Sequence, residues 1–153
     1  MPDDSRSLDI FGVKPIAEAI SKVTSAAVEG AQAFLSRICL PAAEEFGLLL
    51  RDRVRAWRAA NIAAITQKAQ ERLEVEKAPE KVHAHPRLVF RIIAEGSWTD
   101  DQLLQDMWAG LLAASCSQSG QDDSDLIFVN LLSPLTRMEA RVLRYACENA
   151  ASG

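Results

Sequence analysis

The chain has 153 residues, with 17 Lys and Arg against 21 Asp and Glu, and its formal net charge is −4. Hydrophobic residues make up 48% of it and charged residues 25%, which are ordinary values for a globular domain. These values exclude a disordered tail, a collagen-like fibre and a disulfide-rich miniprotein. A chain of this length forms one domain by default, and its acidic balance gives no whole-chain footprint for nucleic acid.

Cysteine usage and the start of the chain indicate a cytoplasmic protein. The three cysteines, Cys39, Cys116 and Cys147, are odd in number and form no CxxC pair. The acidic first residues lack the basic and apolar regions of a signal peptide. We therefore expect reduced, mostly buried thiols.

The first predicted helix covers residues 16–38 and follows a flexible, polar N-terminus at residues 1–13. Apolar residues recur in it at steps of three and four, and Pro41 interrupts the pattern. Glu18 and Glu29, among many small residues, make it too polar to span a membrane alone. Two arrangements stay open for it, one on a membrane surface and one packed against another helix.

The longest predicted element is a single helix from about residue 42 to residue 76. Phe46, Trp57 and Asn61 follow its 3.6-residue period, and nothing breaks the pattern before Pro79. Such a helix is longer than a small domain is wide, so we expect it to bend or to pair with a partner chain.

Shorter helices are predicted beyond the loop at residues 77–85. One begins at Pro86 and is stopped by Gly96. Residues 99–102, Thr-Asp-Asp-Gln, read as a capping box with Thr99 at the cap, and the helix that follows ends near Ser115. The apolar run at residues 124–132 suits a buried strand or a helix, and we predict a helix because no partner strand is visible.

The last helix is predicted to begin at Ser133-Pro134, a cap followed by a proline at the first helical position. The whole pattern predicts an all-α fold, a helical bundle of about six helices with the 42–76 helix at its centre. Residues 14–150 would form one domain with a long-helix half, 14–77, and a short-helix half, 86–150. Six residues are expected in the structural core: Phe46, Trp57, Asn61, Trp108, Leu111 and Pro134.

Charge is distributed unevenly along the chain. Residues 95–125 contain seven acidic residues and no Lys or Arg, whereas Arg51, Arg55 and Arg58 share one face of the long helix. A solvated or intramolecularly paired face is the plain interpretation. A site for phosphate or for an acidic partner is the second. The third is contact between this basic face and the acidic segment of another copy, which contains Asp100, Asp101 and Asp106.

No motif in the sequence indicates catalysis. Glycine-rich phosphate loops and a GxSxG nucleophile elbow are both missing from it. His83 and His85 lie two residues apart in a proline-flanked loop, and a metal site would need further ligands from elsewhere. We therefore expect no catalytic residues, no metal ligands and no cofactor.

Three blocks of sequence resemble a known family. Residues 40–61 read LPAAEEFGLLLRDRVRAWRAAN, similar to the PAAEE(L/I)G element and the WR..N core of the bacterial abortive infection alpha family. Residues 100–113 resemble its lqxlWAxLLA block, and residues 128–143 its L..LSP.DA.iL block. The blocks occur in the family's order, although Phe46 stands where Leu or Ile is usual and Leu40 where Gly is expected.

The resemblance implies an all-α bacterial cytosolic protein linked to phage resistance, and it supplies no catalytic residues. Our leading hypothesis is a non-enzymatic helical protein of an abortive infection system that acts by protein contact and self-association, as a homo-oligomer. The first alternative is a membrane-active effector that uses the helix at 16–38. The second is binding of phosphate or nucleic acid by Arg51, Arg55 and Arg58, although the acidic balance disfavours nucleic acid.

Overall fold

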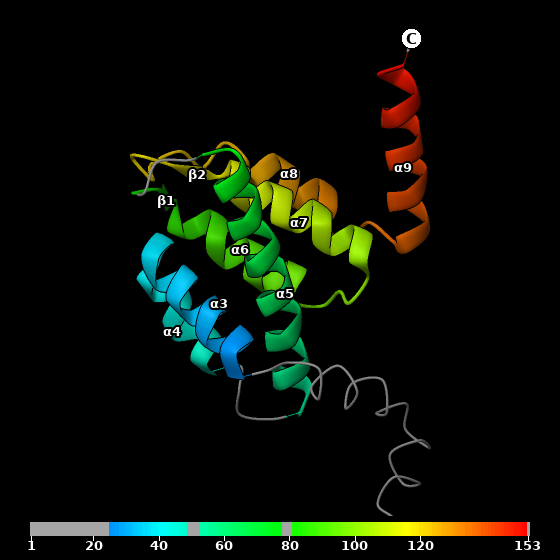
Figure 1. The fold of residues 1–153 in the computed structure, drawn as a ribbon. Helices are drawn as coiled ribbons and strands as arrows, with labels where there is room; N and C mark the ends of the chain where they lie inside the picture. The colour runs from blue at the N-terminus through cyan, green and yellow to red at the C-terminus, as the bar shows by residue number, and fades with distance from the viewer. Residues whose placement is uncertain (1–24, 49–52, 78–80, 153) are drawn as a thin grey trace, which may run out of the picture.

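The fold is described from a computed structural model over residues 25–48, 53–77 and 81–152. Seven helices lie within these ranges and pack as a bundle (Figure 1), which confirms the predicted all-α class. Two short strands join them. The elements are α3 (Ser25–Ile38), α4 (Leu40–Leu48), α5 (Arg53–Val75), β1 (His83–Ala84), α6 (Pro86–Gly96), α7 (Gln102–Ala114), β2 (Cys116–Ser117), α8 (Leu126–Leu132) and α9 (Arg137–Ala150).

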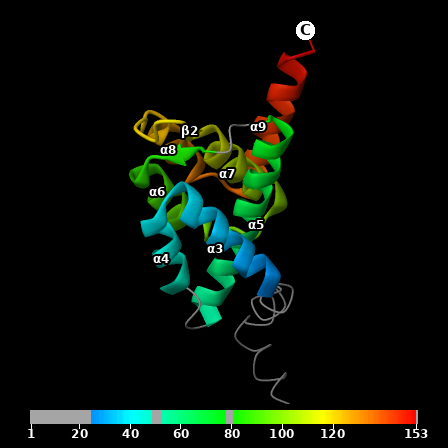
Figure 2. The same ribbon diagram turned by 60° about the vertical axis from the view of Figure 1, so that its left-hand side comes forward.

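One continuous apolar core holds the bundle together, with α5 packed against both α3 and α7. Apolar side chains from six helices, α3 to α8, are fully buried in it, among them Phe46, Ile65, Leu88 and Leu112. At about 1.5–3 kcal/mol for each large apolar side chain, this burial is the main favourable contribution to folding. The core runs from α3 to α8, and α9 stands at its edge (Figure 2).

The six residues expected in the core differ in how deeply the structure buries them. Four of the six are buried: Phe46, Asn61, Trp108 and Leu111. Trp57 is half-buried because it lies at the bundle surface, where its ring meets Trp98 edge to face at 6.3 Å between centroids. The placement of Pro134 in the core is wrong: Pro134 is exposed, since it lies in the turn from which α9 leaves the bundle.

The prediction of one helix over residues 42–76 is also wrong. The structure has two helices there, α4 ending at Leu48 and α5 beginning at Arg53, and they run in opposite directions (Figures 1 and 2). One helix of that length would extend roughly 50 Å, beyond any core that this chain can build. Reversing the chain places Phe46 of α4 and Ile65 of α5 in the same core.

Two helix starts differ from those predicted. Asp101, rather than Thr99, caps α7, because its Oδ1 accepts a hydrogen bond from the Leu104 N–H at 3.1 Å. The last helix begins at Arg137 with Thr136 as its cap, and Ser133 and Pro134 belong to the preceding turn. Thr136 and Glu139 form a reciprocal capping box, which satisfies the N–H groups of both residues at the start of α9.

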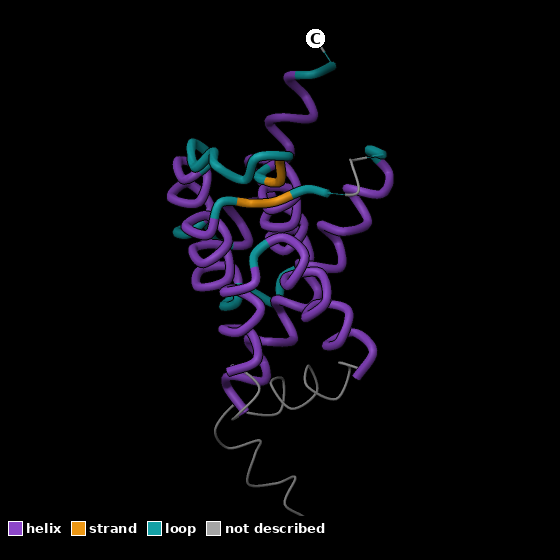
Figure 3. The backbone as a smooth tube through the Cα atoms, turned by 90° about the vertical axis from the view of Figure 1, so that its left-hand side faces the viewer, coloured by secondary structure: helices purple, strands orange, loops and turns teal. Residues whose placement is uncertain are grey.

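A pair of two-residue strands closes one end of the bundle, which the sequence did not indicate. β1 and β2 pair antiparallel, with His83 opposite Ser117 and Ala84 opposite Cys116 (Figure 3). Runs this short carry no alternation that could be recognised in a sequence. The apolar run near residue 128, for which a strand was considered, is the helix α8.

Gly120 is required by this corner of the fold, and Gly120→Ala is expected to destabilise the protein. Its φ is +63°, and a Cβ placed there would lie 2.7 Å from the His83 Cβ. The left-handed conformation alone costs an alanine about 1–2 kcal/mol. Urea unfolding followed by circular dichroism measures the loss. Gly30→Ala is the control: Gly30 is helical with open space around it, so this change should stabilise slightly. Equal stability of the two variants would contradict the prediction.

Candidate interaction site

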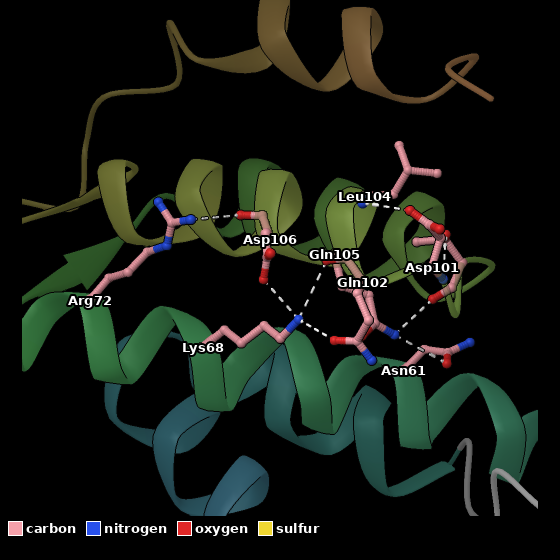
Figure 4. Close-up of polar contacts among 9 residues, drawn as sticks. Asn61, Lys68, Arg72, Asp101, Gln102, Leu104, Gln105 and Asp106 are labelled. Carbon is pink, nitrogen blue, oxygen red and sulfur yellow. Dashed lines mark hydrogen bonds and ion pairs between the residues drawn. The ribbon is translucent and has the colours of Figure 1, made fainter. Parts of the chain in front are cut away.

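The seam between α5 and α7 fixes the position of α7 (Figure 4). The Lys68 ammonium lies 2.8 Å from Asp106 Oδ1 and donates to Gln102 Oε1 at 2.9 Å. One turn further along α5, Arg72 donates to the Asp106 carbonyl oxygen at 3.2 Å. The guanidinium of Arg72 lies over Gly110, where a Cβ would come within 2.9 Å of it. Because these contacts are partly exposed, they contribute little to the free energy of folding. Their main effect is to orient α7 against α5.

A buried polar cluster holds the other end of the same seam. Asn61, only 3% exposed, donates from Nδ2 to the Ser97 carbonyl oxygen at 2.8 Å. Gln105 donates to Asn61 Oδ1 at 3.4 Å and to the Thr99 carbonyl oxygen at 3.0 Å. Asn61, Ser97 and Gln105 are buried and Thr99 is half-buried, so the hydrogen bonds set the register of α5 against α7.

A groove of about 690 Å³ opens on the far side of α7. Its floor and one wall come from α7 and α8, with Leu103, Met107, Phe128 and Leu131 among the apolar side chains. The opposite wall is α9, through Leu143 and three neighbouring residues. Charged side chains line the remainder: Arg72, Asp106, Asp125, Arg144 and Glu148. The groove is therefore mostly apolar with charged residues at its margin, a composition typical of binding sites.

The helix α9 is attached to the bundle at its beginning. Ala140 is buried, whereas every other residue from Arg137 to Ala150 is exposed. Near its start, Arg137 donates to Asp100 Oδ1 at 2.9 Å and its Nε lies 3.8 Å from Asp101 Oδ2. The capping-box hydrogen bonds lower the pKa of Glu139, so that carboxylate stays ionised at neutral pH. The end of α9 projects beyond the bundle (Figures 1 and 2).

Large apolar side chains are exposed on both helices that flank the groove. The seven residues below define what we call the α8–α9 face. They are Ile127, Phe128, Leu131, Met138, Val142, Leu143 and Tyr145, each between 38% and 70% exposed. At about 150 Å² for a large side chain they expose on the order of 600 Å². These exposed apolar side chains on two neighbouring helices make the face a candidate interaction site.

Two of the three arginines of the predicted basic face lie among the described residues. Arg51 lies outside them, and Arg55 is exposed. Arg58 stacks over the Trp98 ring at 4.3 Å from its centroid and donates from Nε to Ser97 Oγ at 2.9 Å. The Arg58 guanidinium therefore stabilises the chain between α6 and α7, as a cation–π partner of an exposed tryptophan.

The three predicted acidic residues all have partners within the chain. Asp100 and Asp101 pair with Arg137 at the start of α9, and Asp106 pairs with Lys68 of α5. Intramolecular pairing was one of the interpretations that the sequence left open. The pairing cations come from α5 and α9, neither of them from the predicted arginine face.

The cysteines differ in exposure, which corrects the expectation that most are buried. Cys39 is buried, Cys116 is half-buried and Cys147 is exposed on α9. Burial raises the pKa of Cys116 to about 11, partly offset by the positive charge of Arg37. In the described part of the chain no group of three or more His, Cys, Asp or Glu is placed to hold a metal ion.

Dilute native protein is therefore expected to react with iodoacetamide first at Cys147, by roughly tenfold or more over the other two thiols at about pH 8. Cys116 stays protonated there because its pKa is about 11, and Cys39 is inaccessible. Mass spectrometry of the alkylated peptides measures the three rates. Cys147→Ser should remove the fast phase, and a fast phase that survives this change would contradict the assignment. In urea the three rates should converge.

Comparison with known proteins identifies the family. A family model described as abortive infection alpha matches residues 58–152, which is more than half of the chain. The chain belongs to the abortive infection alpha family. No curated protein and no solved structure gives a significant match. The match to the abortive infection alpha family starts near the end of the first block quoted above and contains the two later blocks, which form α7, α8 and α9.

The α8–α9 face was missed in the sequence because the apolar residues of the last helix were assigned to no contact. A signal was present. Leu143 and Cys147 lie on one side of α9, while Met138, Val142 and Tyr145 lie on another. A helix that packs on a core needs one apolar side, so the second side indicates a further contact.

Proposed function

We propose that this chain is a helical protein of a bacterial anti-phage, abortive infection system, and that it acts in the cytoplasm by protein contact and without catalysis. Membership of the abortive infection alpha family supports the defence role. The observation that carries the mode of action is the α8–α9 face, with its adjoining groove. Both lie inside the part of the chain that matches the family.

The geometry of this face favours a protein ligand. The groove is open, its walls are helices, and its charged residues lie at the margin. Amphipathic helices bind such grooves by inserting apolar side chains spaced at one-turn intervals. Exposed tyrosine and methionine, as at Tyr145 and Met138, are enriched at protein interfaces.

The membrane alternative has less support. It assigned the contact to residues 16–38, of which 25–38 form α3. The apolar side of α3 is buried against α4 and α5, through Ala31, Phe34, Leu35 and Ile38. Membrane contact by this surface would require α3 to leave the core. None of the helices described is long and apolar enough to cross a membrane.

Phage protection in bacteria tests the proposal. Cells that express the wild-type chain should reduce phage plating, and Val142→Asp should abolish the protection because it places a charge in the contact. Val142 is 62% exposed, so the substitution should leave the fold intact. Circular dichroism and expression level verify this.

Val75→Asp is the matched control, since Val75 is 83% exposed at the end of α5, outside the α8–α9 face. It should protect as well as the wild type. Full protection by Val142→Asp would overturn contact through this face. Wild-type cells that plate phage like cells without the protein would overturn the defence role.

A further inference from the structure

We infer that the groove receives α9 of a second copy of this chain, so that two copies dock reciprocally. The inference deepens the proposed function and rests on it for its biological meaning, because it names the partner of the α8–α9 face. Four observations carry it: a protruding helix, a groove beside that helix, their charges, and the extent of the exposed surface.

The protruding element presents three apolar side chains on the outer side of α9. Met138, Val142 and Tyr145 are spaced i, i+4, i+7 and are 66%, 62% and 70% exposed. At 100° per residue they project within about 60° of one another, opposite the buried Ala140. This spacing is the pattern by which a helix anchors in an apolar groove. None of the three lines the chain's own groove.

The receiving element lies on the same molecule. Leu103 and Met107 of α7, with Phe128 and Leu131 of α8, line the groove that α9 borders. A two-fold interface must be self-complementary, with each copy supplying both the inserted side chains and the surface that receives them. This chain supplies both elements next to each other. In a dimer, α9 of each copy can therefore occupy the groove of the other copy.

Charge also favours this pairing. Residues 95–125, which include α7, carry seven acidic residues and no basic ones, and Asp106 and Asp125 border the groove. Three arginines lie along one side of α9: Arg137, Arg141 and Arg144. Arg137 already bonds to Asp100 at the start of α7 in the same chain. The hydrogen bond and charge of Glu148, and then the charge of Asp106, raise the pKa of Arg144. Counting Glu139 and Glu148 as well, α9 has a net charge of +1, and the charged side chains that line the groove are three acidic and two basic. Charge therefore makes a small favourable contribution to this pairing.

The surface is large enough for a dimer. The α8–α9 face, which already includes groove residues on α8 and α9, exposes on the order of 600 Å² per copy. This is of the same order as the ~800 Å² per partner of a standard stable interface. Because α9 keeps its own capping box and its bonds to Asp100, each copy retains its fold when it docks.

Sedimentation velocity of two variants, alone and mixed, tests the inference. Tyr145→Asp places a charge on the inserted side of α9, and Leu131→Asp places a charge in the groove. Both residues are more than half exposed, so both variants should fold. The wild type should sediment as a dimer, and each variant alone as a monomer. In a mixture, the intact α9 of one variant meets the intact groove of the other. Dimers should therefore reappear, with at least tenfold weaker affinity than the wild type because one of the two contacts stays spoiled.

Val75→Asp is the matched control and should remain dimeric. A wild type that is monomeric at every concentration overturns the inference, and so does a mixture that stays monomeric while both variants are folded. If such a monomer still protects cells and Val142→Asp does not, the contact function stands with a different partner. Binding of the monomeric wild type to anionic phospholipid vesicles, lost in Tyr145→Asp, would assign the face to a membrane and also overturn the inference.

Discussion

Trp108→Ala is expected to destabilise the protein by about 3–5 kcal/mol, the largest effect of any single substitution considered. Trp108 of α7 is 2% exposed, and its ring lies against Gly96 at the end of α6, where a Cβ would be 3.2 Å from it. Alanine would leave a cavity that these two helices cannot close. Since a domain is stable by only about 5–15 kcal/mol, thermal unfolding should show a much lower midpoint.

Trp98→Ala is the matched control for this prediction. Trp98 is 56% exposed, and its contacts are the Arg58 guanidinium and the edge of Trp57. Such contacts contribute on the order of 1 kcal/mol. Similar losses in the two variants would show that Trp108 is not the centre of the core.

Asn61→Leu is expected to cost about 1–3 kcal/mol although leucine is apolar and similar in size. It removes the donor to the Ser97 carbonyl oxygen and the acceptor for Gln105, and both groups stay buried. Urea unfolding measures the loss. Asn130→Leu replaces an exposed asparagine of α8, and it should change stability by only about 0.5 kcal/mol. A neutral Asn61→Leu would mean that apolar contacts alone set the register of α5 and α7.

The apolar periodicity of the sequence, together with prolines and glycines at helix ends, predicts most of the helices. The helix from Pro86 to Gly96 has the predicted limits because a proline opens it and a glycine closes it. The helices α7 and α8 also match, since their apolar runs exceed what a loop tolerates. Cap positions were displaced by two or three residues, because Thr99, Asp101, Ser133 and Thr136 are all good caps and only the packed structure selects among them.

The missed features depend on tertiary structure. The reversal between Leu48 and Arg53 leaves the 3.6-residue period intact on both sides, so the pattern reads as one helix. The β1–β2 pair joins residues more than thirty positions apart over two residues each. The position of α9 depends on the surface of the bundle against which it packs. Its sequence predicts a helix correctly but does not say that Val142 and Tyr145 stay exposed.

The site residues predicted from the sequence and the α8–α9 face are different sets, for a physical reason. The arginine face and the acidic segment were chosen as candidate sites because charge is distributed unevenly along the sequence. Arg58 is committed to Trp98 and Ser97, and Asp106 to Lys68. The sequence analysis assigned no binding role to the apolar residues of α8 and α9, and the structure shows seven of them exposed.

Phage plating on cells that express Tyr145→Asp and Leu131→Asp, separately and together, tests the central claim most directly. The claim is that defence depends on reciprocal contact between copies through the α8–α9 face. Each variant alone should fail to protect, and their co-expression should restore a measurable part of the wild-type protection. Protection by either variant alone would contradict the account. So would co-expression that leaves cells as sensitive as either variant while both proteins are folded and present at wild-type level.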